Sequence, residues 1–458
     1  MNEIKDAIYE KGKIVLFYPT APDTWLHVWF PFPYLYLGPF LEKEGFLVKI
    51  IDARVSERWR NILADEIKDA KYFGVTAMSG PDLGTAIEAC GIVRSFSSSI
   101  PVIWGGHHAR MVPEQILNEG IGDYCFTGRA EYSLVELLLS LENGTDYDAI
   151  KGMVYLSDGK LHGDRSLPSV EFDYDIFPAF HLLDIEKYRS SNNIVACFSS
   201  IGCPFSCSFC TADDFLYYYR TIEQVGRELD TLINKYKFGS IFFTDSIFFI
   251  SKKRVLDIAK YIFNELPEIK WKAAARVNSL LNYTDKERKL LYDSGLRSVF
   301  FGVESGSDTV IKRMDKRITR DQVLESVKIC KDYNLEFYAS FIFATPYETI
   351  DDLQQTLDLI RNIKGIYPQA VIQNSIYLPL PGTQMYDMCV KLGYKPPQTT
   401  KEWAKREVGS DIQKRCADIT WIDPNTLKEY VKIYMDEFPN YKHVYEREKI
   451  GEYSTPLK

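Results

Sequence analysis

Residues 194–210 read IVACFSSIGCPFSCSFC, a short apolar run followed by three cysteines with C-x3-C-x2-C spacing. The run Ile194–Phe198 is typical of a buried strand. The three cysteines follow it among Gly, Pro and Ser residues, a composition typical of a loop rather than a core. Thiolates are soft ligands that favour zinc or iron–sulfur centres. This stretch therefore predicts a strand that leads into a metal-binding loop.

The spacing favours an iron–sulfur cluster over zinc. Structural zinc takes four ligands, commonly in two pairs, and no second pair of the C-x2-C or H-x3-H type lies near this motif. Three thiolates on a four-iron cluster leave one iron open, and an amino acid's amine and carboxylate suit that position. We predict a [4Fe–4S] cluster on Cys203, Cys207 and Cys210. The alternatives are structural zinc and three buried cysteines that act as small hydrophobes.

The composition is that of an ordinary globular protein. The 458 residues are 46% hydrophobic and 26% charged, and they allow two or three domains. The net charge of −8 gives no global basic field, so no nucleic-acid partner is expected. The first residues lack a signal peptide's apolar core, and no apolar run reaches the roughly 18 residues of a spanning helix. We expect a cytoplasmic location, and the nine cysteines, an odd number, argue against a disulfide framework.

Upstream of the cysteines, short apolar runs alternate with amphipathic stretches. This alternation predicts a parallel, doubly wound sheet with ligands at the carboxyl ends of its strands. The expected strands are Lys13–Tyr18, Leu47–Asp52, Tyr72–Thr76, Pro101–Trp104 and Asp123–Thr127. The expected helices are Pro33–Gly45, Asn61–Ala70, Asp82–Phe96, Val112–Asn118 and Ser133–Leu141. Turn signals between Asn143 and Lys187 indicate a linker with a hairpin.

A second alternating series begins at Ile194. Its further expected strands are Ser240–Phe243, Lys272–Ala275, Ser298–Gly302, Phe337–Phe343 and Ala370–Tyr377. Helices are expected at Thr221–Lys235, Lys253–Glu265, Asp285–Ser294, Arg320–Tyr333 and Ile350–Ile363. A full eight-unit barrel takes about 250 residues, so this shorter series predicts a partial (β/α)6 barrel.

The chain is thus expected to be an α/β protein with a Rossmann-like domain, a partial barrel and a small, mostly helical extension. The expected boundaries are 1–145 for the first domain, 146–190 for a linker, 191–385 for the barrel and 386–458 for a C-terminal capping region.

Residues 194–385 resemble the radical S-adenosylmethionine (SAM) superfamily, whose signature is this cysteine spacing with an aromatic residue before the last cysteine. The resemblance implies a cluster, SAM and an electron donor such as flavodoxin or ferredoxin. It implies SAM contacts from Phe209 and from strand-end residues, namely Asp245, Arg276, Glu304, Ile342 and Tyr377. The stretch 341–346 resembles the backbone that holds adenine, although the family usually has glycine where this chain has Ala344. Taken singly, a strand-end Arg or Glu is more often solvated or salt-bridged.

The amino-terminal part resembles the cobalamin-binding domain that is often fused to such barrels, through GVTAM at 74–78, WGGHH at 104–108 and DYCFTGRAE at 123–131. The resemblance implies cobalamin contacts from Thr76, Met78, Gly105, Gly106, His107, Tyr124, Gly128, Arg129 and Glu131. The loop with Trp25, His27 and Trp29 is expected under the corrin. His107 replaces the usual proline, Arg129 replaces the usual glutamate, and the D-x-H-x-x-G motif is absent. The alternative is a Rossmann-like domain without cofactor.

Together these features predict a cobalamin-dependent radical SAM enzyme. It would cleave SAM reductively to a 5′-deoxyadenosyl radical and methylate an unactivated carbon of a small-molecule or natural-product substrate. The alternatives are a cyclase, rearrangement or oxidation enzyme that binds cobalamin without methyl transfer, and a non-catalytic metal- or corrinoid-binding protein. A methylthiotransferase is disfavoured because only the scattered Cys90, Cys125 and Cys197 precede the motif. The sequence indicates neither the substrate, nor the catalytic residues, nor the oligomeric state.

Overall fold

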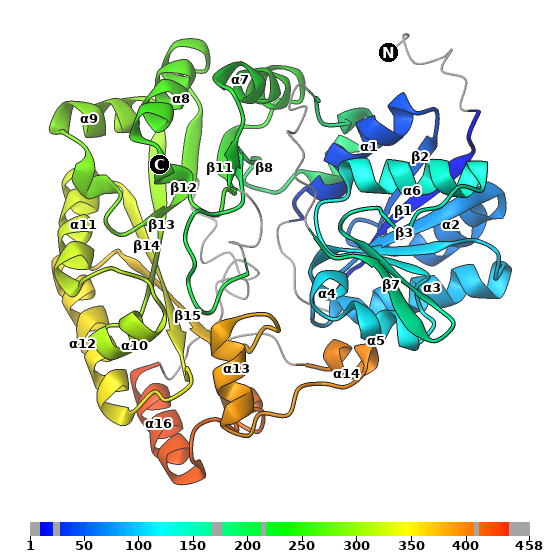
Figure 1. Cartoon of the computed structure of the whole chain (residues 1–458). Coiled ribbons are helices and arrows are strands. Elements are labelled where there is room, and N and C mark those ends of the chain that lie inside the picture. The colour runs from blue at the N-terminus through cyan, green and yellow to red at the C-terminus, as the bar shows by residue number, and fades with distance from the viewer. Residues whose placement is uncertain (1–9, 22–27, 167–175, 212–216, 407–411, 439–458) are drawn as a thin grey trace. The chain divides into compact units, whose positions relative to one another are not determined.

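The computed structural model describes residues 10–21, 28–166, 176–211, 217–406 and 412–438. The chain divides into two compact units (Figure 1). The first unit contains Met1–Tyr188 and Pro397–Val408, and the second contains Arg189–Pro396 and Gly409–Lys458. No helix in these described ranges is long and apolar enough to cross a membrane.

The first unit is built on a seven-stranded sheet with the order β2-β1-β3-β4-β5-β6-β7. Its first five strands are parallel, and the last two are antiparallel. The strands are β1 (Lys13–Tyr18), β2 (Leu47–Asp52), β3 (Ala70–Thr76), β4 (Val102–Gly105), β5 (Tyr124–Phe126), β6 (Met153–Ser157) and β7 (Lys160–Asp164). The strand order reverses at β1, so right-handed crossovers place helices on both faces and the switch point lies between β1 and β3. This confirms the doubly wound prediction.

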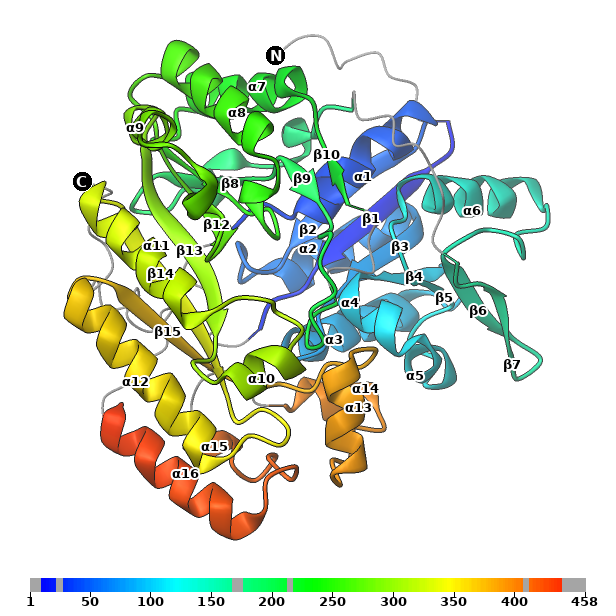
Figure 2. The ribbon, with the colours of Figure 1, turned by 60° about the vertical axis from the view of Figure 1, so that its left-hand side comes forward.

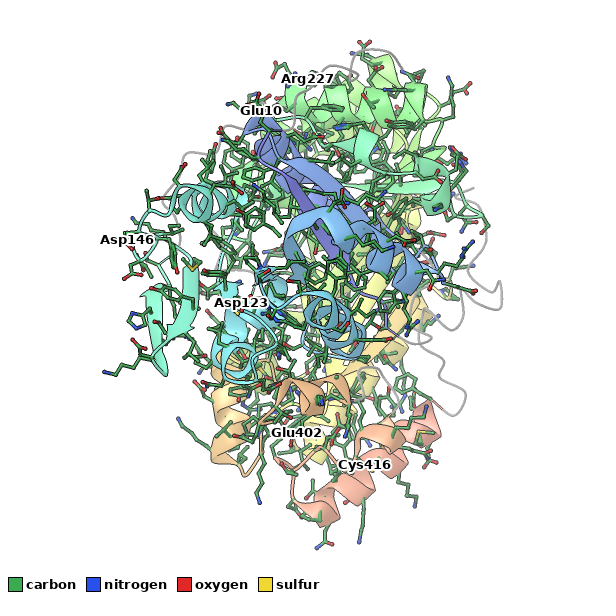
Figure 3. The ribbon with its side chains drawn as sticks, turned by 90° about the vertical axis from the view of Figure 1, so that its right-hand side faces the viewer. Glu10, Asp123, Asp146, Arg227, Glu402 and Cys416 are labelled. Atoms are coloured by element: carbon green, nitrogen blue, oxygen red, sulfur yellow. The ribbon has the colours of Figure 1, made fainter. Side chains whose placement is uncertain are left out.

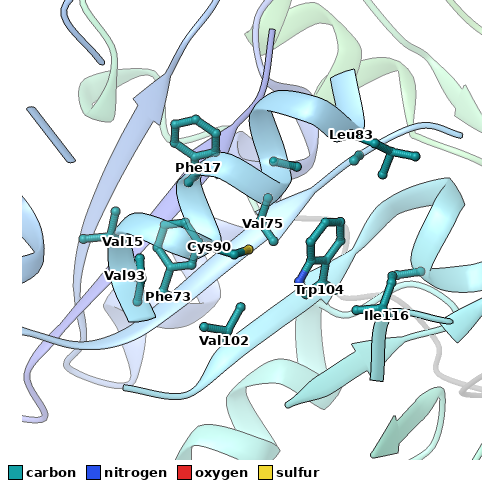
Figure 4. Close-up of a cluster of buried hydrophobic side chains, with 14 of the residues drawn as sticks. Val15, Phe17, Phe73, Val75, Leu83, Cys90, Val93, Val102, Trp104 and Ile116 are labelled. Atoms are coloured by element: carbon teal, nitrogen blue, oxygen red, sulfur yellow. The ribbon is translucent and has the colours of Figure 1, made fainter. Parts of the chain in front are cut away.

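Side chains that alternate along the strands divide this unit's core into two layers. Val15 and Phe17 of β1 face one layer, and Ile14 and Leu16 face the other. Figure 4 shows the first layer, where Phe17, Phe73 and Trp104 pack beneath the helices. The helices are α1 (Phe32–Lys43), α2 (Trp59–Glu66), α3 (Asp82–Phe96), α4 (Gly106–Met111), α5 (Pro113–Asn118) and α6 (Glu131–Asn143). The first layer packs under α2, α3 and α5, and the second under α1 and α6.

Asp123 ties β4 to the segment that enters β5 and is labelled in Figure 3. Its carboxylate accepts hydrogen bonds from the Val102 N–H and from Arg94 Nη2, each at 2.7 Å. This contact fixes the start of two strands whose carboxyl ends carry expected cofactor residues.

The expected linker and capping region lie differently from the prediction. The hairpin β6–β7 extends the first sheet because β6 pairs antiparallel with β5, which covers an otherwise open strand edge. The helix α14 (Thr400–Ala404), expected to cap the barrel, belongs to the first unit. Its Trp403 is buried in the first core layer, and the Thr400 N–H donates to Glu119 Oε1 at 2.8 Å. Only tertiary packing decides this placement. A tryptophan such as Trp403 is expected to be buried whether α14 packs against the barrel or against the first sheet.

The second unit contains a six-stranded parallel sheet with the order β15-β14-β13-β12-β11-β8. The strands are β8 (Ile194–Cys197), β11 (Ser240–Phe243), β12 (Lys270–Arg276), β13 (Leu296–Glu304), β14 (Glu336–Phe343) and β15 (Val371–Ile376). Each strand lies beside its predecessor, so every right-handed crossover places its helix on the same face. This arrangement, visible in Figures 1 and 2, confirms the six expected β/α units.

The helices of this unit follow its strands in regular order. They are α7 (Ile222–Asp230), α8 (Lys252–Glu265), α9 (Asp285–Asp293), α10 (Asp308–Arg313), α11 (Arg320–Asp332), α12 (Ile350–Ile366) and α13 (Gln384–Lys391). Four of them begin with capping boxes, in which a threonine and a residue three positions later satisfy each other's backbone N–H. The tail adds α15 (Ile412–Arg415) and α16 (Pro424–Glu437).

Candidate active site

The three motif cysteines lie on one loop that leaves the sheet after β8. The short strands β9 (Ser200–Ile201) and β10 (Tyr218–Tyr219) pair antiparallel and close the base of that loop. Cys203, Cys207 and Cys210 are half-buried and form no disulfide bond. The Cys210 N–H donates to the Cys207 carbonyl at 3.0 Å, which tightens the turn between these two cysteines.

The three thiols are ligands of the type that holds an iron–sulfur cluster. Within the described ranges, no three His, Cys, Asp or Glu side chains converge as ligands of one metal ion. In a cubane each cysteine binds a different iron, so such convergence is not required. Burial raises the pKa of the Cys203 thiol above its ordinary value. Iron binding would offset this cost, because a coordinated thiol is held deprotonated.

The three cysteines upstream of the motif serve the core. Cys90, Cys125 and Cys197 are at most 1% exposed and lie on α3, β5 and β8. Burial raises the pKa of each of these thiols. Inert, scattered thiols of this kind do not form a second cluster site.

The middle of the cysteine loop is anchored at Ser208. Its N–H donates to the Met314 carbonyl at 3.0 Å, and its hydroxyl donates to the Arg313 carbonyl at 2.7 Å. The Ser208 carbonyl accepts from the Met385 N–H at 2.9 Å. Ser208 is buried between the two later cysteines, so these bonds fix the loop where it must hold its ligands.

Asp245, expected to contact SAM, follows β11 and is 3% exposed. Its carboxylate accepts from the Ser199 N–H at 3.0 Å, from the Ser199 hydroxyl at 2.7 Å and from the Ser200 hydroxyl. Burial raises the pKa of this carboxyl. The Arg254 guanidinium donates to the Ser199 carbonyl at 2.5 Å. Asp245 therefore holds the segment that enters the cysteine loop, and its direct contact with SAM stays a prediction.

Arg276 and Glu304 lie near the motif through a lysine that the sequence reading missed. The Arg276 guanidinium stacks 4.0 Å from the Phe205 ring centre and donates to the Lys316 carbonyl. Lys316 Nζ lies 2.7 Å from Glu304 Oε1 and 5.6 Å from the Phe209 ring centre. This buried pair sits against Gly302, where an added Cβ would lie 2.4 Å from Glu304 Oε1 and 2.6 Å from Lys316 Nζ. Gly302, near the end of β13, is the sequence feature that could have indicated a close contact at this point.

Ile342 and Tyr377 follow the expected pattern at the last two strands. Ile342 is half-buried on β14 between the fully buried Phe341 and Phe343. Tyr377 is buried after β15, and its carbonyl accepts from Arg415 Nη2 at 2.8 Å. The structure thus brings five expected residues close to strand ends of one sheet, whereas Phe209 lies on the cysteine loop.

In the first unit, the expected glycines form a close approach at the ends of β3 and β4. Gly106 has φ +83°, and a Cβ there would lie 2.4 Å from Thr76 Oγ1. A Cβ on Gly105 would meet no described atom within 4 Å. Glycine is therefore required at 106 by the fold, whereas the open space at 105 suits a cofactor that approaches the backbone.

Two histidines share one serine at the start of α4, a helix that the sequence reading missed. Nδ1 of His107 and Nδ1 of His108 lie 3.3 and 3.1 Å from Ser79 Oγ. Burial lowers the pKa of His107 to about 4 and that of His108 to about 3, so both rings are neutral at pH 7. One hydroxyl can donate to only one Nδ1, so the two rings adopt different tautomers. Both Nε2 atoms are buried without a hydrogen-bond partner among the described residues. Each is therefore available for a hydrogen bond to a bound group at the start of α4.

The remaining expected cobalamin residues differ in placement. Met78, just beyond β3, is 58% exposed. Arg129 Nη2 lies 2.5 Å from Glu131 Oε1, directly after Gly128, so the unusual arginine is paired with the expected glutamate. Tyr124 is instead the first residue of β5, and its ring packs against Tyr147 and Tyr155. Tyr124 therefore does not lie at the carboxyl end of its strand. It is the first residue of β5, and Phe126 of the same motif is the last.

The expected loop under the corrin is described only in part. Trp25 and His27 lie outside the described residues. The Trp29 carbonyl accepts from Arg54 Nη2 at 2.9 Å, and the same guanidinium pairs with Asp52 at 2.6 Å. This contact connects the loop to the end of β2.

A surface pocket of about 550 Å³ lies between α10 and the start of α11. Its walls carry acidic and basic side chains in balance, including Asp308, Lys312 and Arg320. None of the expected SAM residues lines it, so we do not assign it to the reaction.

Two family models match the regions just described. Residues 198–360 match the radical SAM superfamily, and residues 23–138 match the B12 binding domain. The chain belongs to the radical SAM superfamily and carries a B12 binding domain. The expected enzyme class and the expected cofactors, a [4Fe–4S] cluster, SAM and cobalamin, are thereby confirmed.

Relatives of this radical SAM enzyme include more than one reaction type. It is 29% identical over 368 residues to "Uncharacterized methyltransferase PH0819" from Pyrococcus horikoshii. This alignment covers 79% of this chain and 78% of that protein. It is 24% identical over 347 residues to the anaerobic magnesium-protoporphyrin IX monomethyl ester cyclase of Rubrivivax gelatinosus, over 73% of this chain and 62% of that protein.

Solved structures share the fold. The methyltransferase TsrM from Kitasatospora setae, with cobalamin and a [4Fe–4S] cluster bound, superposes with a TM-score of 0.68 at 20% identity, over 83% of this chain and 75% of that chain. The cobalamin-dependent SAM radical enzyme OxsB, with aqua-cobalamin and SAM bound, gives a TM-score of 0.74 at 18% identity, over 97% of this chain and 71% of that chain.

Proposed function

We propose that this radical SAM enzyme is a C-methyltransferase that acts on an unactivated carbon of a small molecule. The observation that carries the proposal is the pairing of one three-cysteine loop with a B12 binding domain in a chain that offers no second set of cysteine ligands in its described part. Names of relatives agree, since a methyltransferase and two hopanoid methylases are among them.

When bound, the cluster and SAM supply the carbon radical, and cobalamin supplies the methyl carrier. The chain's own residues position and enclose these groups. The cysteine loop is fixed at its base by Asp245 and in its middle by Ser208. Lys316 and Glu304 place a fixed, buried ion pair beside Phe209 of the motif. At the end of β4, Gly105 and Gly106 let a cofactor approach the main chain.

The test needs no knowledge of the substrate. The enzyme is reconstituted anaerobically with iron, sulfide and cobalamin, reduced, and given SAM, and the products are separated by liquid chromatography with mass detection. A methyltransferase should form S-adenosylhomocysteine in an amount equal to the bound cobalamin, and 5′-deoxyadenosine should form from reductive cleavage. Loss of both products from an enzyme with full iron and cobalamin would contradict the proposal.

A cyclase is the second candidate, because relatives named magnesium-protoporphyrin IX monomethyl ester cyclase match over most of this chain. The same experiment separates the two. A cyclase should form 5′-deoxyadenosine while S-adenosylhomocysteine stays at the level of a cobalamin-free control.

A further inference from the structure

The turn after β14 contains an alanine in an unfavourable backbone conformation. Ala344 has φ +57°, a left-handed value that L-residues other than glycine rarely adopt, and its side chain is fully buried. Tyr347, three residues later, has φ +62°. Such strain persists only where the surrounding structure restrains it, and it is concentrated at functional sites.

Side chains from the tail supply this restraint at Ala344. The Ala344 N–H donates to Tyr430 Oη at 2.9 Å. The Trp421 indole N–H donates to the Ala344 carbonyl at 2.8 Å. Both main-chain polar groups of one strained residue are therefore held by aromatic side chains from more than seventy positions away.

The restraint extends through the turn to Glu348. Tyr430 donates its own hydroxyl proton to Glu348 Oε1 at 2.9 Å, while Glu348 Oε2 accepts from the Thr345 N–H at 2.7 Å. The tyrosine hydroxyl thus accepts on one side and donates on the other. Ala344, Glu348 and Tyr430 are all buried, so each of these bonds is shielded from water.

The same turn is connected to the cysteine loop through one arginine. Arg313 Nη1 donates to the Pro346 carbonyl at 2.9 Å, and the Arg313 carbonyl accepts from the Ser208 hydroxyl at 2.7 Å. Ser208 lies between Cys207 and Cys210. A shift of the 344–348 turn would therefore be transmitted to the segment that carries the cluster ligands.

We infer that Tyr430 and Trp421 are positioning residues that hold the strained Ala344 turn in the shape needed to bind the adenosyl part of SAM. This inference rests on the proposed function, since it assumes that SAM binds at this end of the barrel. It assigns the tail after residue 412 to the SAM pocket, where it compensates for an alanine at a position that glycine would occupy without strain.

The test is a double-mutant cycle on the reconstituted, unreduced holoenzyme, with SAM affinity measured by equilibrium dialysis. Tyr430→Phe keeps the six-membered ring and removes both hydrogen bonds of the hydroxyl, to Ala344 and to Glu348. Trp421→Phe removes the one hydrogen bond to Ala344 and replaces the indole by a smaller aromatic ring. Each variant should weaken SAM binding about tenfold, the equivalent of about 1.4 kcal/mol. Adding Ala344→Gly to either variant should restore most of that loss, because glycine adopts the turn without the restraint. Tyr434→Phe on the same helix, whose ring packs 5.0 Å from Phe343, is the matched control and should keep the wild-type affinity.

Rescue by glycine is a result that a merely structural role would not give. Unchanged SAM affinity in both aromatic variants, or a loss that Ala344→Gly does not rescue, would overturn the inference. If Tyr430→Phe fails to fold, the Trp421→Phe pair decides alone. Iron and cobalamin contents are measured in every variant. A wild-type enzyme that neither binds nor cleaves SAM would instead contradict the proposed function, so the two failures are distinguishable.

Discussion

Helices begin differently in the two units. In the second unit, α7 to α13 each start with a Ser or Thr whose side chain accepts a backbone N–H of the first turn. In the first unit, the six helices α1 to α6 show no such side-chain bond among the described residues. The short helix α14 is the exception in that unit, since its Thr399 side chain accepts from the Glu402 N–H. A capped terminus satisfies its own donors, whereas an uncapped one leaves N–H groups at the carboxyl ends of the strands.

This difference separates two ways of building a cofactor site. The second unit places side chains at its strand ends, with cysteines on a braced loop and a buried Lys316–Glu304 pair beside the motif. The first unit places main chain there, with Gly105 and Gly106 at the end of β4 and two neutral histidines directly after them in the sequence. A site built from side chains should therefore lose its cofactor when a functional group is removed. A site built from main chain should lose its cofactor when an added methyl group blocks the approach.

The largest expected effect follows removal of a cluster ligand. Cys203→Ala should lower 5′-deoxyadenosine formation more than about 100-fold, because loss of a direct ligand exceeds the effect of outer-shell changes. Iron content should fall while cobalamin content stays unchanged. Cys416→Ser, which changes a free, half-buried cysteine outside the motif, is the control (labelled in Figure 3). A parallel loss of cobalamin would contradict this prediction, because it would show that the loss of iron also empties the first unit's site.

A methyl group added at the first unit's glycines should distinguish fold from site. Gly106→Ala should lower the free energy of unfolding by about 3 kcal/mol, since its φ is +83° and its Cβ would press on Thr76 Oγ1. Gly105→Ala should leave stability nearly unchanged, because no described atom lies within 4 Å of its Cβ. If cobalamin covers this glycine, the same variant should bind it more weakly. Thermal unfolding and bound-cobalamin absorbance measure the two effects, and equal stabilities of both variants would contradict the geometry.

Acidification should stabilise the second unit through Glu348. Burial raises the pKa of this carboxyl to about 7 in the folded chain, against an ordinary value of 4.5. Between these values the folded state binds the extra proton, so its stability rises as pH falls. From pH 7.5 to pH 5 the wild type should gain about 2 kcal/mol relative to Glu348→Gln, which has no such group to titrate. Parallel pH profiles of the two proteins in denaturant unfolding would show that Glu348 titrates normally.

The smallest expected effect tests the caps themselves. Thr284 accepts from the Glu287 N–H in the capping box of α9, on the helical layer of the second unit. Thr284→Ala should cost about 1 kcal/mol, while Thr284→Ser should keep the hydroxyl acceptor and most of the stability. Thermal unfolding measures both. An equal cost for the two variants would show that the lost hydrogen bond is not the cause.

Strands and their order of appearance were predictable because burial imposes a readable pattern on each of them. All six barrel strands and the five parallel strands of the first unit lie where apolar runs predicted them. The α4 helix at Gly106 was missed because Gly-Gly is typical of a turn, and the helix starts at a glycine with a positive φ and no room for a Cβ beside Thr76. The hairpin was expected as part of a linker, since pairing of β6 with β5 is a long-range contact with no local signal.

The sequence by itself determined the chemistry of the cluster, because three thiolates on a four-iron cluster leave one iron open, and the identity and spacing of the cysteines are local properties. It also determined the two sheets, through hydrophobic periodicity. Tertiary structure decided which polar groups meet. The partners of Asp245, Glu304 and Ala344 come from other strands, loops or the distant tail. Such pairings are set by how the elements pack in three dimensions, and no local pattern of residues encodes them.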